Sequence, residues 1–233
     1  SLIFSGMHEE PMRQQIAHRA KWAAGVIDKV NWEAHEKAYT SQKRVSRIGI
    51  CKLANGLLHT NHEAHKLYGT ANLCPCCGTT EETFMHMLTC GDEAVATNRA
   101  AALDELTKSL AAAKTPEKVQ NMLLHGIASW TANPSSTHAP LYRGSVLPVD
   151  CILVQAYQEQ SEIGWDHLLR GRTSLKWSAA YRASIAGSRQ QQVDPMPWNK
   201  QVILALWAYT RNLWQFRNGI VHGQTVEAAA ELE

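Results

Sequence analysis

The stretch from Cys74 to Cys90, "CPCCGTTEETFMHMLTC", holds four of the six cysteines of the chain and a histidine. Cys74 and Cys77 form a C-x2-C pair followed by Gly78, which is typical of a tight turn that points two thiolates at one metal ion. His86 and Cys90 follow as H-x3-C, a spacing that puts both side chains on one face of a helical turn. The stretch therefore predicts a CCHC zinc knuckle over residues 74–90.

Three thiolates and one imidazole leave no coordination position for water, and this donor set suits a structural Zn²⁺ ion better than a catalytic one. The predicted metal ligands are Cys74, Cys77, His86 and Cys90. Glu81, Glu82 and Thr83 fit the start of the helix that carries His86, where acidic side chains favour the helix dipole. Three apolar residues are expected to pack behind the ion as a small core: Phe84, Met87 and Leu88.

Other readings of the cysteines stay open at this point. A disulfide network would need an oxidising compartment, and an iron–sulfur cluster prefers cysteine to histidine and usually has other spacings. Cys76 lies between the two knuckle cysteines and could replace Cys74 or Cys77 as a ligand. Cys51 and Cys151 lie in apolar helical settings, which favours inert core thiols.

The composition bounds the class of protein. A chain of 233 residues with 45% hydrophobic content can bury a core without disulfides, as one large domain or two small ones. The sequence has no apolar run of about 20 residues and no secretory signal pattern, so we expect an intracellular protein, nuclear or cytoplasmic, with no membrane partner. A first residue other than Met and the linker-like tail "VEAAAELE" lead us to expect a piece of a longer polypeptide.

Hydrophobic periodicity predicts a mainly α fold, a helical domain with the zinc knuckle embedded in it. Residues 1–130 are expected to form a helical region around the knuckle, residues 131–150 a linker or long loop rich in Pro, Ser and Gly, and residues 151–226 a C-terminal helical region. Helices are expected from Met12 to Val30, from about Lys43 past Gly56, and through two stripes between Val95 and Trp130. The strongest helix is expected from Trp198 to about Phe216, because its wide apolar band is typical of a buried central helix.

A net charge of +2 does not by itself indicate a nucleic-acid-binding protein, but the charges are segregated along the chain. Cations gather at helical spacings before the knuckle and again around "LRGRTSLKW". We consider both a solvated helix face and a phosphate-binding surface for them. The candidate nucleic-acid contacts are Lys43, Arg44, Arg47, Lys52, Arg170, Arg172, Lys176 and Arg182.

Eight tryptophans are many for a chain of this length. Trp198, Trp207 and Trp214 follow the stripe of the last helix, which favours core packing. Trp165 and Trp177 flank the second group of arginines and are the candidates for stacking on bases.

Taken in order, "KRVSRIGICKLANGLLHTN", a spacer and "LCPCCGTTEETFMHMLTC" are similar to the zinc-binding region downstream of the polymerase in non-LTR (LINE-type) retrotransposon reverse transcriptases. "SEIGWDHLLRGRTSLKW" and "LWQFRNGIVHG" also look like segments that follow the finger in retroelement-derived proteins, so the likeness extends from about Asn31 to Gly223. One departure is the H-x3-C spacing, where many relatives have H-x4-C.

The resemblance implies a zinc finger in an accessory module that grips RNA or DNA, either in a reverse transcriptase or in a domesticated derivative. The polymerase part would lie elsewhere in the parent polypeptide, because this chain contains no polymerase motif and no glycine-rich phosphate loop.

Two other functions compete with this one. "RNGIVH" fits the R-x4-H pattern and resembles the motif of the HEPN family of α-helical ribonucleases, which need no metal; Arg217 and His222 would then be catalytic. The same residues can instead serve the end of a helix, with Arg217 favouring its dipole. A helical protein-interaction scaffold is the third possibility.

Overall fold

The protein is mainly helical, as the sequence predicts, and its centre is the long helix α11 (Met196–His222). The computed structural model describes residues 13–134, 148–185 and 193–223. Strand pairing among these residues is limited to two isolated bridges, Val30–Ser174 and Leu73–Glu81.

Helical elements follow one another along the described chain, and the longest fully described connection, residues 69–83, carries the first two cysteines of the predicted metal site. Residues 13–20 are helical. The elements after them are η1 (Ile27–Lys29), α2 (Trp32–Thr40), α3 (Arg44–Ala54), α4 (Asn61–Tyr68), α5 (Phe84–Thr89), α6 (Glu93–Ala112), α7 (Glu117–Ala132), α8 (Pro148–Ile163), α9 (Trp165–Leu169) and α10 (Lys176–Ser184).

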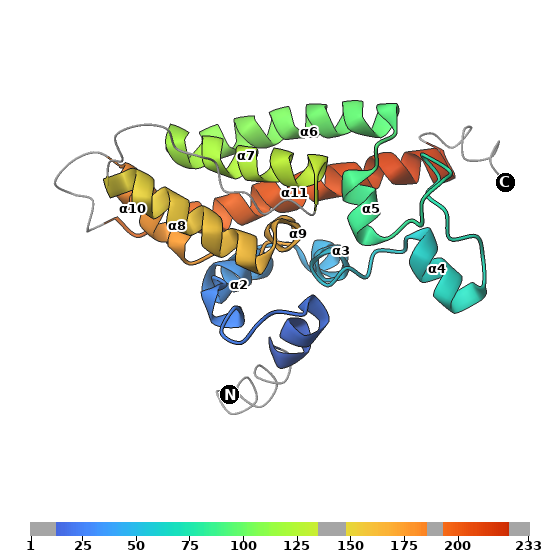
Figure 1. Cartoon of the computed structure of the whole chain (residues 1–233), viewed down its shortest axis with the longest axis horizontal. Coiled ribbons are helices and arrows are strands. Elements are labelled where there is room, and N and C mark those ends of the chain that lie inside the picture. Colours follow the sequence, from blue (N-terminus) through green and yellow to red (C-terminus); the bar gives the residue numbers. More distant parts are fainter. Residues whose placement is uncertain (1–12, 135–147, 186–192, 224–233) are drawn as a thin grey trace.

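Helix α11 runs along the long axis of the molecule, and the other helices pack around it (Figure 1). It contacts α2, α5, α6 and α9. Helices α6 and α7 lie on one side of α11, with α2 and α3 on the other. Helices α8 and α10 pack on each other near the start of α11, and α5 lies near its end. The end of α11 therefore meets the cysteine-rich segment.

One hydrophobic core spans residues from both halves of the chain. Leu53 and Leu106 belong to the same buried cluster as Leu153, Leu206 and other residues after position 150. The broad apolar band of α11 explains this, because buried side chains lie on several faces of the helix. Burying one large aliphatic side chain stabilises the fold by roughly 1.5–3 kcal/mol. Phe84, Met87 and Leu88, from the segment that carries the predicted metal ligands, belong to this main core and not to a separate small one.

Helices α7 and α9 approach closely at Gly126. A Cβ atom at this position would lie 1.9 Å from the Trp165 ring, so any larger residue would collide with the indole. The glycine lets Trp165, which is 5% exposed, fill the space between the two helices. Trp165 is therefore a core residue.

The expected helix from Met12 to Val30 is interrupted, and the prediction was wrong in its second half. Helical residues end at Ala20, and Lys21 has a φ of +54° that an α-helix does not allow. The chain then turns so that the Trp22 indole donates a hydrogen bond of 2.7 Å to the Ile163 carbonyl. Tertiary packing on α8 overrides the local helical pattern.

The expected linker over residues 131–150 falls largely outside the described residues, which omit 135–147. At its edges, Thr131 and Ala132 belong to α7, and Pro148 begins α8.

Two cysteine predictions need correction. Cys51 and Cys151 are exposed, not buried in the core. Cys51 lies on α3 and Cys151 on the first turn of α8, each on the outward side of a helix whose other side is buried. Apolar neighbours in sequence did not distinguish the two faces.

Candidate metal centre

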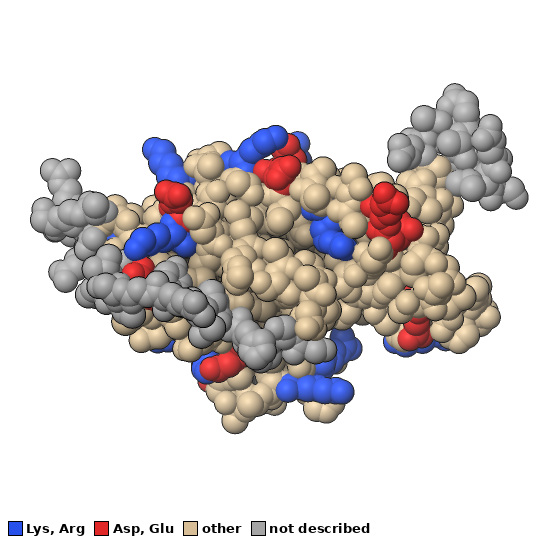
Figure 2. Space-filling model, turned by 45° about the horizontal axis from the view of Figure 1, so that its top comes forward, with Lys and Arg blue, Asp and Glu red and all other residues tan. Residues whose placement is uncertain are grey.

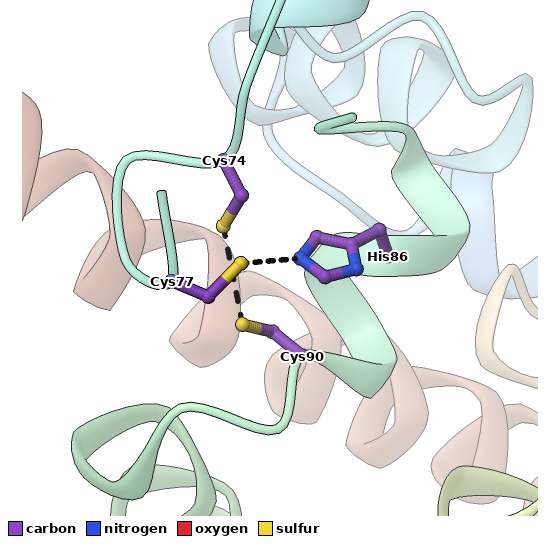
Figure 3. Close-up of side chains that lie close together, drawn as sticks. All are labelled: Cys74, Cys77, His86 and Cys90. Carbon is purple, nitrogen blue, oxygen red and sulfur yellow. Dashed lines mark hydrogen bonds between the residues drawn. The ribbon is translucent and has the colours of Figure 1, made fainter. Parts of the chain in front are cut away.

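Four side chains from one short segment meet beside the end of α11. The thiols of Cys74, Cys77 and Cys90 and the His86 imidazole each offer one ligand atom, and these atoms lie within 4.8 Å of one another. Figure 3 shows the three sulfur atoms and the imidazole pointing toward one another. Cys76 is not part of this group, and all six cysteines are free thiols. The predicted ligand set is thus brought together, and this group could hold a metal ion.

The first two ligands come from a tight turn. Gly78 N donates to Cys74 O at 2.8 Å, and Cys74 N donates to Thr80 O at 2.7 Å, which folds the backbone back on itself. Gly78 has a φ of +67°, in the left-handed region that favours glycine. Thr79 Oγ1 donates to Cys77 Sγ at 3.5 Å. The turn holds the Cys77 sulfur in a polar surrounding.

The other two ligands come from α5 and its end. Thr83 caps this helix by accepting a hydrogen bond from His86 N at 3.1 Å. His86 lies in the helix, and Cys90 is the residue directly after it. Both ligands therefore face the turn from one side, as the H-x3-C spacing predicts.

The distances fit the edges of a tetrahedron around a zinc-sized ion. Cys74 Sγ and Cys90 Sγ are 3.9 Å apart, and Cys77 Sγ and His86 Nε2 are 3.4 Å apart. Zinc bonds to sulfur and nitrogen require edges of about 3.8 Å and about 3.6 Å. Cys74 and Cys90 are also buried, at 3% and 1% exposed. The geometry suits a closed, four-coordinate site.

The thiols have contrasting proton affinities. Hydrogen bonds from Thr79 lower the pKa of Cys77 to about 5, whereas burial raises the pKa of Cys90 to about 12. Burial also raises the pKa of Cys76 to about 12, so this neighbour favours the neutral thiol. A bound cation favours the thiolate form of every sulfur that it contacts, and its binding would release protons.

A buried ion pair ties the end of α11 to this segment. Arg217 donates from Nε and Nη2 to the two carboxylate oxygens of Glu82, both at 2.6 Å. Glu82 is fully buried and Arg217 is 5% exposed. Asn61 completes the network, because its Oδ1 accepts from Arg217 at 3.0 Å and its backbone N–H donates to Glu82 at 2.6 Å. Every part of the carboxylate thus has a partner.

Helix α6 supports the cluster from another side. Arg99 Nη1 donates to the carbonyl oxygens of Leu88 and Cys90, at 3.3 and 3.0 Å. Val95 packs with Cys74 and Cys90 in a small apolar cluster, against which Phe216 also packs. The candidate metal centre is therefore joined to α6 and α11 and does not hang on a free loop.

The first group of predicted nucleic-acid contacts lies on α3 and at its start. Lys43, Arg44 and Lys52 are exposed, and none of them forms an ion pair with a described residue. Arg47 differs, because its Nε donates to Gln42 O at 2.9 Å, it also hydrogen-bonds the Thr40 carbonyl, and its guanidinium lies over the Tyr39 ring. Arg47 serves the turn between α2 and α3.

The second group of predicted contacts is largely turned inward, which corrects the sequence reading. Arg172 is 4% exposed, and Arg170 pairs with Asp166 at 3.2 Å and lies 4.4 Å over the Phe84 ring. Both arginines follow α9, whose side chains are buried, so they cannot form an open surface. Lys176 is half-buried and donates to Gln155 at 3.2 Å, and Arg182 on α10 is half-buried.

The two tryptophans proposed for base stacking are also core residues. Trp165 and Trp177 are 5% and 1% exposed. Their indole N–H groups donate to Ser161 Oγ and Gln160 Oε1, both at 3.2 Å. Aromatic residues beside arginines in sequence did not reveal that both kinds of side chain are buried.

Arg217 and His222, the alternative catalytic pair, do not converge. Arg217 points into the buried network with Glu82, whereas His222 is exposed as the last residue of α11. Within the described chain no hydrogen bond joins the two side chains. The role of Glu82 as the partner of Arg217 was missed from the sequence, since 135 residues separate the pair and no local pattern marks it.

Cations and acids are mixed on the face that α6 and α7 form. Figure 2, in which the α6 side of the molecule comes forward, shows Lys and Arg next to Asp and Glu and no extended surface of one sign. Among the described residues, no helix has the length and apolar character needed to cross a membrane.

Comparison with protein-family models, curated proteins and solved structures finds no match to this chain.

Proposed function

We propose that this chain is a zinc-stabilised nucleic-acid-binding module whose metal is structural. The donor set supports zinc, since three thiolates and one imidazole at tetrahedral spacing suit Zn²⁺ and not an oxygen-seeking cation such as Mg²⁺ or Ca²⁺. All four positions are taken by protein ligands, so the ion has no site for a substrate or an activated water molecule. Its role is to hold the turn at Cys74 against α5.

The single observation that carries nucleic-acid binding is the exposed side of α3. Residues 41–60 contain no acidic side chain, and Lys43, Arg44 and Lys52 are exposed without a carboxylate partner in the described chain. Val45 and Ile48 are 85% and 64% exposed on the same helix. Unpaired cations give the phosphate grip, and apolar side chains beside them contact sugars or bases.

The likeness to retroelement proteins gives this proposal its biological setting. It favours RNA or DNA as the partner, and on this proposal a polymerase would belong to the same parent polypeptide. The resemblance suggests nucleic-acid binding as the function, and the exposed residues of α3 are the groups that would contact the nucleic acid.

A charge-reversal experiment tests the proposal. Fluorescence anisotropy with labelled single-stranded RNA and duplex DNA would be measured over a series of salt concentrations for the wild type and for the triple variant Lys43→Glu, Arg44→Glu, Lys52→Glu. The logarithm of the association constant falls linearly with the logarithm of the salt concentration, and each phosphate contact contributes about 0.7–0.9 to the steepness of that line. Loss of three contacts should therefore reduce the steepness by about 2 to 3.

The matched control reverses three cations away from α3: Lys108, Lys114 and Arg211, all exposed. It changes net charge by the same amount and should retain most of the affinity and slope. Equal loss in both triple variants, or no binding by the wild type at physiological salt, would overturn the proposal. The second result would favour the protein-interaction scaffold.

A further inference from the structure

A cleft of about 750 Å³ opens on the side of the molecule where helical residues 13–20 and the following turn meet α9. Trp22, Asn55 and Met85 contribute to its walls, so it borders α3 and α5 as well. The volume is that of a small-molecule site. None of the predicted metal ligands lines it.

The inner wall of the cleft carries more positive than negative charge. Arg19, Lys21, Arg170 and Arg172 line it, against the acids Glu162 and Asp166. Both acids already have cationic partners, because Glu162 pairs with Lys29 and Asp166 pairs with Arg170. Asp166 also attracts Arg172, so one carboxylate is shared between two guanidinium groups. In the part of the chain that the structure describes, no carboxylate forms an ion pair with Arg172 or with the rim cations Arg19 and Lys21.

Arg172 is the critical residue, because it is 4% exposed and, among the described residues, its side-chain hydrogen bond goes to a neutral partner. Its Nη1 donates to His167 Nδ1 at 2.7 Å, so this imidazole nitrogen must be unprotonated. Burial lowers the pKa of His167 to about 2, and Trp22 packs on its ring with centroids 4.6 Å apart. His167 therefore orients the guanidinium but adds no negative charge.

The guanidinium groups also have hydrogen-bonding capacity left over. The Nε atoms of Arg170 and Arg172 are buried and have no hydrogen-bond partner among the described residues. Burial lowers the pKa of Arg172 only to about 10, so it is charged at neutral pH. Two buried guanidinium groups that share the single carboxylate of Asp166 leave an excess of positive charge, which an anion in the cleft would offset.

We propose that this cleft binds a phosphate monoester of about nucleotide size, with the phosphate held by Arg172 and by the rim cations Arg19 and Lys21. Guanidinium groups recognise phosphate through charge-assisted hydrogen bonds, and the number of unpaired cations suits a dianion. The apolar walls at Ile16, Trp22 and Met85 leave room for the organic part of the ligand.

The phosphate could belong to a free nucleotide or to the 5′ end of a nucleic-acid strand, which share this chemistry. This cleft is separate from the α3 surface, so phosphate binding here does not depend on nucleic-acid binding by α3.

Calorimetric titration with AMP, with adenosine and with inorganic phosphate would test the inference on the zinc-loaded protein. We expect AMP to bind in the micromolar to millimolar range, phosphate more weakly, and adenosine not measurably. The double variant Arg19→Gln, Lys21→Gln changes exposed residues and should fold normally, yet weaken AMP binding about tenfold. Arg172→Lys keeps the charge but loses the guanidinium plane, and should weaken it by at least as much.

The control is the triple α3 variant described above, which should bind AMP like the wild type. An oligonucleotide with a 5′ phosphate is then compared with its 5′-hydroxyl twin. If the wild type prefers the phosphorylated strand and the Arg19, Lys21 double variant does not, the ligand is the 5′ end of a strand. If the wild type shows no preference, the ligand is a free small molecule. The absence of AMP binding at millimolar concentration in the folded protein, or binding that both cleft variants leave unchanged, would overturn the proposal.

Discussion

Arg217, near the end of α11, and Glu82, just before α5, form a buried pair joined by two hydrogen bonds of 2.6 Å. The two residues are 135 positions apart. Their contact joins the last described helix to the segment that carries the candidate metal ligands, and Asn61 adds a third partner.

Breaking this pair should strongly destabilise the protein. Arg217→Met leaves the fully buried carboxylate of Glu82 without its cation, and we expect a loss of about 3–5 kcal/mol in the free energy of unfolding by urea. The double variant Arg217→Met, Glu82→Gln removes both charges and should recover part of the loss. Arg211→Met, an exposed change on the same helix, should alter stability by less than about 0.5 kcal/mol. A single variant as stable as the wild type would show that the pair contributes nothing.

Metal content should follow the four-residue group and no other cysteine. Elemental analysis is expected to give one zinc per chain for the wild type and for Cys76→Ser and Cys51→Ser, whereas Cys77→Ser should lose zinc and more than about 4 kcal/mol of stability. Strong chelator should unfold the region around α5. Retention of zinc by Cys77→Ser with loss in Cys76→Ser would mean that Cys76 is the ligand.

The close contact between α7 and α9 gives a prediction with an internal control. Gly126→Ala would place a methyl group 1.9 Å from Trp165 and should destabilise the protein by about 1–3 kcal/mol. Gly49→Ala lies in α3 with nothing within 4 Å of the added carbon and should stabilise by about 0.4–1 kcal/mol. The two thermal unfolding midpoints should therefore move in opposite directions; a shared direction would contradict the packing described.

Acid should destabilise the protein through His167. Its pKa is lowered from 6.5 to about 2, so the unfolded chain binds one more proton between these values. The neutral form contributes stability that is complete above about pH 6.5 and is lost as the pH falls toward 2, with a slope of up to about 1.4 kcal/mol per pH unit.

The measurement compares urea unfolding at neutral pH and at about pH 5 for the wild type and His167→Asn, both with excess zinc. Protonation of the metal ligands affects both proteins alike, so the difference isolates His167. We expect the wild type to lose about 2 kcal/mol more than the variant over this interval. Equal losses would mean that His167 is not held neutral.

A substitution at the exposed end of α11 distinguishes a nucleic-acid-binding protein from a ribonuclease. His222→Ala removes the histidine of the R-x4-H pattern while leaving the Arg217 pair intact. Labelled RNA incubated with wild type and variant should remain uncut in both cases. Cleavage by the wild type that the variant loses would support the ribonuclease hypothesis instead.

Local patterns predicted the parts of this protein that local forces determine. The ligand group follows from two short spacings, because a turn and one helical turn suffice to bring four side chains together. The apolar band of α11 likewise follows from periodicity alone. Both features need little information from distant residues.

Features that depend on distant residues were not predictable. Whether Arg170 and Arg172 face solvent depends on how α9 packs against α5 and the N-terminal turn, and nothing near them in sequence records this. Cys51 shows the opposite error, because a residue in an apolar stretch of sequence is exposed in the structure. The Arg217–Glu82 pair has no sequence signature because its geometry exists only after the helices assemble.

The distance along the chain between Glu82 and Arg217 also bears on biosynthesis. A ribosome releases the cysteine-rich turn long before it releases the end of α11, so the four candidate ligands emerge while the Glu82 carboxylate has no cation to pair with. Closure of the fold must wait for the last helix to emerge, and a transcript truncated before Arg217 would yield a polypeptide with an unpaired carboxylate in an open interior.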